Sequence, residues 1–387
     1  MTYFPLTASQ AEWKERVADL ARREIGPRAE RADRERRYPR ESLEALREAG
    51  LWGLRVSPEH GGLGADLLTT CLIVEEIAKQ CPSTAMCYKM HLEASEVLVR
   101  APTPYQVDQF VEPLGRGEIL ATVAGSESQG AGDNWTSAST MSAVTKVPGG
   151  YQLDGVRKSY VTSAGQASHY FFLCRIGEDS PNDSMSLLWV PGDAVEWEIL
   201  EPWEGLGLRG NESSPMRFSG FVPEECRIGS EHTAMADLGA HFRPVMGLTY
   251  AAAYLGIGSG AFEIALREGD RRFPSGSRRL DNPTNQRRLA ELSVKIEAAQ
   301  TMLHAVAAMS DRGELHSPLP IFQAKVLCSE TAVEVTQELM TMFGGTAFAA
   351  RLPFERYFRD ARAGLIMALA NDGTYLNIAT ALVPPTN

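Results

Sequence analysis

The sequence has few cysteines, and their spacing suggests neither a disulfide framework nor a metal site. Six cysteines occur among 387 residues, none of them in a C-x-x-C pair or at a zinc-like spacing from the seven histidines. The H-E-x-x-H, G-x-S-x-G and P-loop lysine motifs are also missing. We therefore expect six buried, reduced thiols, a cytosolic protein and no bound metal.

Positive charge is scarce as well. The chain has 38 lysines and arginines against 49 aspartates and glutamates, which gives a formal net charge of −11. Such a surface attracts neither nucleic acid nor an anionic membrane, so small molecules and protein partners remain. The N-terminal residues lack a basic stretch followed by an apolar one, which predicts that there is no secretory signal.

Long runs of leucine and isoleucine are absent too. One uncharged stretch, residues 244–262, is about long enough to span a bilayer, but it is rich in small residues and tyrosine. It therefore predicts a buried, closely packed helix and no membrane span. Gly256, Gly258 and Gly260 lie inside this helix and not after a strand, so close packing explains them better than dinucleotide binding.

The periodicity of apolar residues divides the chain into three regions. Residues 8–116 follow a helical pattern, as in Trp13, Val17 and Leu20. Between 117 and 230, short apolar runs alternate with turn signals, and Asp154-Gly155 predicts a hairpin turn. After 230 the pattern is helical again. We expect an α+β protein with an N-terminal α-helical domain (1–116), a middle β-barrel or sandwich domain (117–230) and a C-terminal helical bundle (231–387).

Three segments contain residues suited to a flat or anionic ligand. Residues 126–133 follow a predicted strand, and their small side chains would let the backbone approach such a ligand. Residues 158–165 lie at the end of another predicted strand, where the aromatic Tyr160 precedes the hydroxyl-bearing Thr162. Residues 343–374 contain the pair Gly344-Gly345, several arginines and Asp372. Ordinary alternatives are a polar loop for the first segment and a helix N-cap role for Asp372.

Together these segments resemble the acyl-CoA dehydrogenase family of flavoproteins over nearly the whole chain. Residues 58–64, P-E-H-G-G-L-G, are similar to its P-E-x-G-G-x-G, and residues 127–133 resemble its T-E-P-x-A-G-S-D run. Residues 160–162, Y-V-T, resemble W-I-T. Residues 343–345 and 359–362 resemble L-G-G and R-D-A-K, and the chain's ending is similar to a bacterial subgroup that includes enzymes acting on carrier-protein thioesters.

The resemblance implies FAD, a homotetramer or homodimer, and dehydrogenation of a small acyl thioester between its α and β carbons. The thioester would be carried by CoA or a carrier protein, and the electron acceptor would be one such as an electron-transfer flavoprotein. Asp372 of Asp-Gly-Thr matches the glutamate that serves as base in the family's E-G-T. The expected substrate contacts are Gly132, Arg243 and Met246. The expected flavin contacts are Val123, Ser126, Tyr160, Val161, Thr162, Arg271, Arg272, Phe273, Gly344, Gly345 and Thr374.

Departures from the family pattern leave alternatives open. Asp372 is shorter than glutamate and lies several residues further from the R-D-A signature. The family's other base position falls on the long helix near Met246 or Gly247, where there is no carboxylate. The arginine that the family usually has at this level of the helix is missing, although Arg243 lies one turn earlier. A reduced-flavin monooxygenase and a nitroalkane-type FAD oxidase on the same fold therefore stand beside the dehydrogenase.

The family's R-x-x-F-G, which meets the flavin pyrophosphate across a subunit boundary, is D-R-R-F-P at residues 270–274. Arg271 or Arg272 replaces the family's arginine if the position shifts by one or two residues. Further arginines nearby suggest an anion site in this acidic chain, and a solvated basic loop is the alternative.

Overall fold

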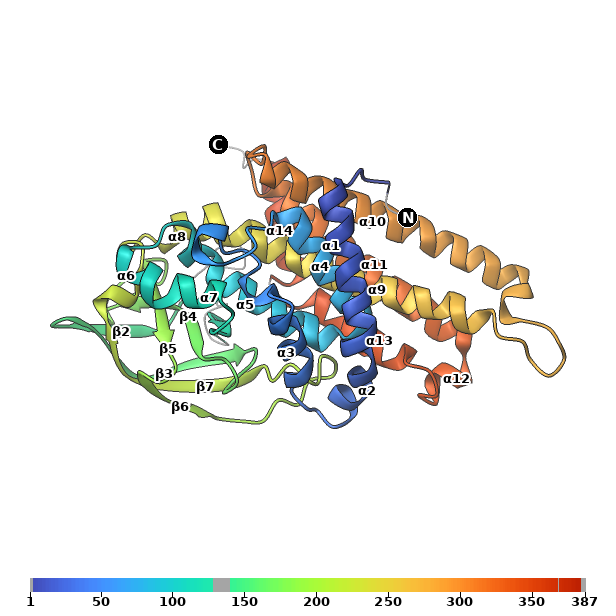
Figure 1. Ribbon diagram of the computed structural model, residues 1–387, viewed down its shortest axis with the longest axis horizontal. Helices are drawn as coiled ribbons and strands as arrows, with labels where there is room; N and C mark the ends of the chain where they lie inside the picture. The colour runs from blue at the N-terminus through green and yellow to red at the C-terminus, as the bar shows by residue number, and fades with distance from the viewer. Residues whose placement is uncertain (1–2, 128–139, 368, 384–387) are drawn as a thin grey trace.

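The computed structural model describes residues 3–127, 140–367 and 369–383, and it has a β domain beside a long helical body (Figure 1). The strands gather at one end, and α9, α10 and α11 extend toward the other. This arrangement confirms the predicted fold class, in which a β region lies between two helical regions along the chain.

The N-terminal helices begin at residues that satisfy their free backbone N–H groups. Thr7 forms a capping box with Gln10 at the start of α1, and Asp66 accepts a hydrogen bond from Thr69 N at the start of α4. α5 begins with Pro82, which lacks the N–H that a first helical turn leaves unbonded. The α-helices are α1 (Ala8–Leu20), α2 (Gly26–Arg34), α3 (Arg40–Glu48), α4 (Leu67–Gln80), α5 (Pro82–Arg100), α6 (Pro104–Gln106) and α7 (Glu112–Gly115).

The middle region forms a mainly antiparallel sheet with the order β6-β7-β3-β2-β4-β5-β8. β1 lies off this path and pairs in parallel with β4, so the strand nearest the N-terminal helices joins the sheet near its middle. The strands are β1 (Ala121–Ala124), β2 (Ala143–Val147), β3 (Gly150–Val161), β4 (His169–Ile176), β5 (Met185–Pro191), β6 (Val195–Ile199), β7 (Ser214–Pro223) and β8 (Arg227–Ile228).

The predicted hairpin at Asp154-Gly155 is wrong. β3 continues through this pair, and its register with β7 shifts between Leu153 and Val156. The pair therefore forms a bulge in one long strand, with Gly155 at φ +62°. Asp-Gly suits a bulge as well as a turn because glycine adopts positive φ at no steric cost in either. The turn between β2 and β3 lies instead at Gly149, with φ +82°.

The C-terminal region is built around α9. Its bounds are Arg243–Gly269, and it packs against α4, α5, α10 and α11. Among the described residues, the helical run Ala234–Gly269 is long and apolar enough to cross a membrane, but 89% of its most apolar window is buried inside the protein. The other α-helices are α8 (Ala234–Asp237), α10 (Pro283–Asp311), α11 (Leu319–Phe343), α12 (Gly345–Phe348), α13 (Phe354–Ala361) and α14 (Asn371–Leu382).

The glycines of α9 let neighbouring backbones approach, which confirms the packing interpretation. A Cβ at Gly256 would lie 2.5 Å from Glu75 O, and one at Gly260 would lie 2.4 Å from Lys79 O, both on α4. On the opposite side, a Cβ at Gly258 would lie 3.1 Å from the Cα of Ala332 in α11. α9 therefore contacts α4 on one side and α11 on the other, backbone to backbone, at the centre of the helical core.

We predict that Gly260→Ala destabilises the protein by about 1–3 kcal/mol, because the added methyl group meets fixed backbone of α4. Gly345→Ala is the matched control, since no atom lies within 4 Å of its added Cβ, and its effect should stay within about 0.5 kcal/mol. Thermal and denaturant melting of both variants measures this. Equal midpoints for the two variants would contradict the packing argument.

Candidate active site

A cavity of about 730 Å³ lies where the β domain meets the helical body, and we call it the interdomain cavity. Its walls are largely apolar. One wall is formed by the β domain and includes Val123 and Phe171, and a second is formed by α5 and α9. The C-terminal segment closes the remainder with Ala363, Ile366, Met367 and Leu369.

Six of the predicted site residues line this cavity. They include a pair at the end of β3, where alternation directs Tyr160 and Thr162 to the cavity and Val161 into the buried β core. The Tyr160 side chain is 55% exposed, whereas the Thr162 hydroxyl lies 2.8 Å from Ser213 Oγ. The six residues are Val123, Ser126, Tyr160, Thr162, Arg243 and Met246. The predicted contact at Gly132 lies outside the described residues.

Asp372 lies beside the cavity but does not line it. The N-cap of α14 is Ala370, so the alternative N-cap role for Asp372 is wrong, and its exposed carboxylate belongs to the first turn of the helix. The helix starts there because Asn371 Oδ1 accepts a 2.6 Å hydrogen bond from the buried Lys325 Nζ. The same ammonium also donates to the carbonyl oxygens of Gly364 and Leu369, so one lysine holds both ends of this wall.

The remaining predicted flavin contacts do not line the cavity, although Thr374 lies next to it, in a small hollow that it shares with Arg243 and Met246. Thr374 is buried and donates from Oγ1 to Ala370 O within its own helix. The loop that contains Arg271, Arg272 and Phe273 extends beyond α9 at the end opposite the β domain (Figure 1). Gly344 and Gly345 lie at this same end, because Arg279 donates to Met342 O just before them. The predicted contacts therefore form two separate groups within one chain.

Acidic neighbours neutralise part of the basic loop. Arg271 pairs with Glu268 at 2.7 Å, and Arg278 pairs with Asp270 and Asp281 at 2.7 and 2.8 Å. Arg272 donates to the carbonyl oxygen of Gly276 at 2.6 Å. These pairs order the loop, although its arginines stay largely exposed.

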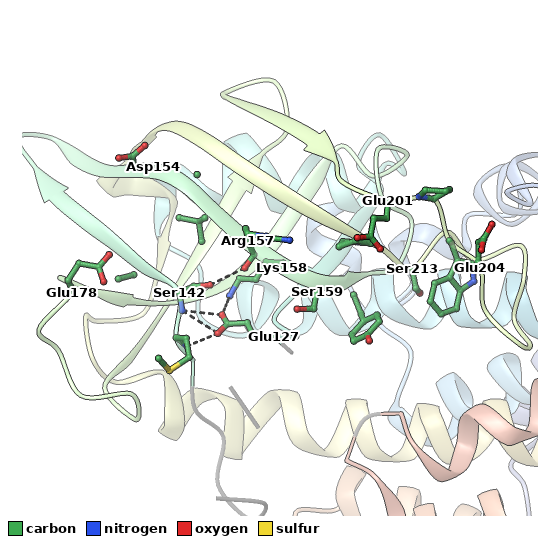
Figure 2. A pocket seen from close by; sticks show the side chains of 18 residues that line it. Glu127, Ser142, Asp154, Arg157, Lys158, Ser159, Glu178, Glu201, Glu204 and Ser213 are labelled. Atoms are coloured by element: carbon green, nitrogen blue, oxygen red, sulfur yellow. Dashed lines mark hydrogen bonds and ion pairs between the residues drawn. The ribbon is translucent and has the colours of Figure 1, made fainter. Parts of the chain in front are cut away.

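A more polar hollow of about 900 Å³ lies next to the interdomain cavity and shares Tyr160, Trp203 and Ser213 with it. Figure 2 shows the side chains of Glu127 and Lys158 pointing toward one another at its edge. Lys158 is fully buried and also donates to Leu173 O at 2.6 Å.

Glu127 ties the polar hollow to the strands around it. Besides Lys158, its carboxylate accepts hydrogen bonds from Thr140 Oγ1 and from the backbone N–H groups of Met141 and Ser142. Burial raises the pKa of Glu127, but the Lys158 ammonium and these donors outweigh burial and hold the pKa below its usual value. Glu127, which matches the glutamate of the family's T-E-P-x-A-G-S-D run, therefore links residues 140–142 to Lys158 on β3.

The Arg-Asp pair of the R-D-A signature fixes another wall of the cavity. Arg359 donates to both carboxylate oxygens of Asp33 in α2, at 2.9 and 2.6 Å. Asp360 is buried and accepts a 2.6 Å hydrogen bond from Leu208 N, in a loop whose residues 205–208 line the cavity. The signature thus attaches this loop and α2 to α13. Burial raises the pKa of Asp360 to about 6.

One acidic residue of the cavity wall was not predicted from the sequence. Glu93 on α5 is the only carboxylate among the described residues that line the interdomain cavity, and its side chain is paired with Lys89 one turn earlier. Burial raises the pKa of Glu93. Two opposite charges four residues apart, on a segment predicted to be helical, were the available signal.

A β domain between two helical regions, with an apolar cavity at their junction, is an arrangement suited to an enzyme that binds an apolar ligand between its domains. The matching family descriptions are the N-terminal, middle and C-terminal domains of acyl-CoA dehydrogenase, at residues 7–118, 122–221 and 245–382. The chain belongs to the acyl-CoA dehydrogenase family, whose members are oxidoreductases that act on CH–CH groups.

Relatives match over almost their full length. The chain is 31% identical over 373 residues to cyclohexane-1-carbonyl-CoA dehydrogenase of Geobacter metallireducens, covering 94% of this chain and 95% of that one. It is 27% identical over 369 residues to the probable acyl-CoA dehydrogenase FadE25 of Mycobacterium tuberculosis, covering 93% and 91%. Butyryl-CoA dehydrogenase of Megasphaera elsdenii has the same fold, with a TM-score of 0.90, 23% identity and coverage of 98% and 99%.

We predict that the ionisation of Asp360 costs native-state stability. The pKa of about 6 in the fold exceeds the ordinary aspartate value of 3.8, so the native state binds this proton more tightly than the unfolded chain does. The free energy of unfolding of the wild type, relative to Asp360→Asn, should therefore fall as pH rises from about 4 to about 6, by about 2–3 kcal/mol. Denaturant melts across this pH range test it, and a constant difference would contradict it.

We also predict that Lys158→Met destabilises the β domain by about 3–5 kcal/mol, because it leaves the Glu127 carboxylate without its buried partner. Arg217→Met breaks the exposed Arg217–Glu198 pair on neighbouring strands and should cost less than about 1 kcal/mol. Thermal melting followed by circular dichroism compares the two variants. Similar losses of stability in both variants would show that breaking the buried Lys158–Glu127 pair costs no more than breaking an exposed one.

Proposed function

We propose that the chain is an FAD-dependent enzyme that removes two hydrogens from the α and β carbons of a small acyl thioester carried by CoA or a carrier protein. The observation that carries this proposal is the interdomain cavity, which combines apolar walls with the Tyr160–Thr162 strand end in a member of this family. A cytosolic location fits the six cysteines, which are all free and buried.

The residues of the cavity fit the flavin ring. Val123, Phe171 and Leu173 supply apolar surface for a flat aromatic system, while Ser126 and Thr162 supply hydroxyl groups at its edge. The backbone of β3 at Val161 joins these contacts. When bound, FAD would supply the acceptor for the hydride that leaves the β carbon.

A second copy of the chain completes the proposed cofactor site. Arg271, Arg272, Phe273, Gly344 and Gly345 lie at the opposite end from the interdomain cavity, so within one chain they do not reach the same flavin. A homodimer or homotetramer that brings this end against the cavity of a neighbour would place arginines at the FAD pyrophosphate.

Asp372 is the proposed base. It lies between Leu369 and Asn377, which both line the cavity, and Lys325 fixes the segment in front of it. From this position a rotated carboxylate takes the α-proton while Arg243 and Met246 contact the substrate. Thr374, two residues further on, is proposed to contact the flavin from the same helix turn. The electrons then pass to an acceptor such as an electron-transfer flavoprotein.

Two oxidative alternatives share this cavity. The first alternative rests on the exposure of Asp372 and on the lack of a carboxylate at Met246 and Gly247 of α9, since it uses no carboxylate base. A reduced-flavin monooxygenase needs none, whereas a nitroalkane-type FAD oxidase would still use Asp372. Oxygenated product that depends on a flavin reductase and is insensitive to changes at Asp372 identifies the monooxygenase.

We predict that the purified protein binds FAD and that a short acyl-CoA bleaches the flavin absorbance near 450 nm (an approximate flavin band position) under anaerobic conditions. Asp372→Asn should lower the rate of this bleaching by about 10²–10⁴-fold, because the α-proton loses its acceptor. Asp372→Glu is the matched control and should retain most of the rate, since it keeps the carboxylate.

The same experiment separates the parts of the proposal. A protein that cannot be reconstituted with FAD would contradict the cofactor. An Asp372→Asn variant that binds FAD and reacts at the wild-type rate would contradict the base and leave the cofactor assignment standing.

A further inference from the structure

The interdomain cavity has one strongly polar feature in an otherwise apolar inner wall. Glu93 and Lys89 lie one turn apart on α5, and their side chains are 1% and 0% exposed. Glu93 borders the cavity together with Met90 of the same helix and Tyr250 of α9. An apolar acyl chain would gain nothing from this ion pair, because removing two charges from water carries a desolvation cost.

The contacts around Glu93 hold it in one orientation. Lys89 Nζ contacts the carboxylate oxygen Oε1, and Thr249 Oγ1 lies 3.1 Å from the same oxygen, with its hydroxyl shared between this contact and Val245 O at 2.7 Å. Lys89 Nζ also lies 3.1 Å from the centroid of the Tyr250 ring and 3.4 Å from Met90 Sδ. These contacts are made to the ammonium and to Oε1, and Glu93 itself is among the residues that line the cavity.

A second buried carboxylate on the same helix provides the contrast. Glu96 lies less than one turn away and pairs through both oxygens, with Arg55 Nε at 2.9 Å and Arg55 Nη2 at 2.7 Å. Arg100 adds a third donor, and Glu96 does not line the cavity. Glu96 therefore has the full set of contacts of a structural ion pair, and Glu93 does not.

We propose that Glu93, held by Lys89 and Thr249, is a polar subsite that accepts a hydrogen bond from a hydroxyl group on the acyl chain of the substrate. This proposal rests on the proposed function and specifies its substrate class. A hydroxyl donates to the carboxylate without changing the charge of the site.

The charge balance excludes the two other kinds of polar end group. A terminal carboxylate on the substrate would meet the like charge of Glu93. A terminal ammonium would leave one uncompensated positive charge, because Glu93 is already neutralised by Lys89. An alkyl end offers the buried ion pair no hydrogen bond, which favours the hydroxyacyl thioester over an alkyl one of equal length.

The test uses the FAD-loaded enzyme with length-matched CoA thioesters. The hydroxyl-bearing members are 4-hydroxybutyryl-CoA and 5-hydroxypentanoyl-CoA, the alkyl matches are pentanoyl-CoA and hexanoyl-CoA, and succinyl-CoA carries a carboxylate. We expect the better hydroxyacyl-CoA to exceed its alkyl match roughly tenfold in kcat/KM, the discrimination typical of a hydrogen bond to a charged group. Succinyl-CoA should be the poorest substrate. Equal kcat/KM for the matched pair would overturn the subsite.

The variants identify the residue responsible. Lys89→Met/Glu93→Leu replaces both charges together, and it should fold, bind FAD and lose or reverse the hydroxyl preference while it still oxidises the alkyl thioester. Glu96→Gln is the matched control, because it also disturbs a buried ion pair on α5, and it should keep the wild-type preference. A preference that survives in the double variant overturns the proposal. Loss of all turnover in a folded, flavin-bound Glu93→Gln enzyme overturns it too, since Glu93 would then act as the base.

Calorimetric binding of the same thioesters to the oxidised enzyme separates this proposal from the proposed function. Tighter binding of the hydroxyacyl-CoA without any flavin reduction would support the subsite and contradict the dehydrogenation. Flavin reduction by both members of a pair with equal Kd and equal kcat/KM would support the dehydrogenation and overturn the subsite.

Discussion

The close approach of α9 to α4 and α11 is the constraint on which the rest of the structure depends. Gly256, Gly258 and Gly260 remove the side chains that would separate these backbones, so the uncharged part of α9, residues 244–262, passes through the centre of the helical body. This packing sets where both ends of α9 lie. One end brings Arg243, Met246 and Tyr250 to the interdomain cavity, and the other carries the arginine-rich loop.

Buried ion pairs surround the cavity. Some of them connect distant segments of the chain, whereas one is proposed to contact the substrate. Asp33–Arg359 and Glu127–Lys158 each connect segments far apart in the sequence, and Glu127 also accepts from the backbone of Met141. Such pairs cost desolvation energy, so their value is to specify one arrangement of the elements. Lys89–Glu93 differs because both charged residues belong to one helix turn and Glu93 lines the interdomain cavity, while the pair's contacts with α9 come from the uncharged residues Thr249 and Tyr250.

Much of the fold could be predicted because its signals are local. The helices and strands follow from periodicity and capping residues such as Thr7 and Asp66, and the predicted order of helical, β and helical regions is confirmed. The hairpin at Asp154-Gly155 failed because the same two residues suit a bulge, and only the pairing of β3 with β7 distinguishes these possibilities. The N-cap role of Asp372 failed because the start of α14 depends on Lys325, which is remote in sequence.

The sequence by itself determined the family, the order of the regions and the side chains at the end of β3, since these depend on residue type and spacing along the chain. The tertiary structure decided which predicted residues share a cavity. Six of them do, whereas the basic loop and Gly344-Gly345 lie at the far end, and Asp372 lies beside the wall. It also placed Glu93 in the cavity. Proximity across the chain and access to solvent arise from packing, and no local pattern encodes them.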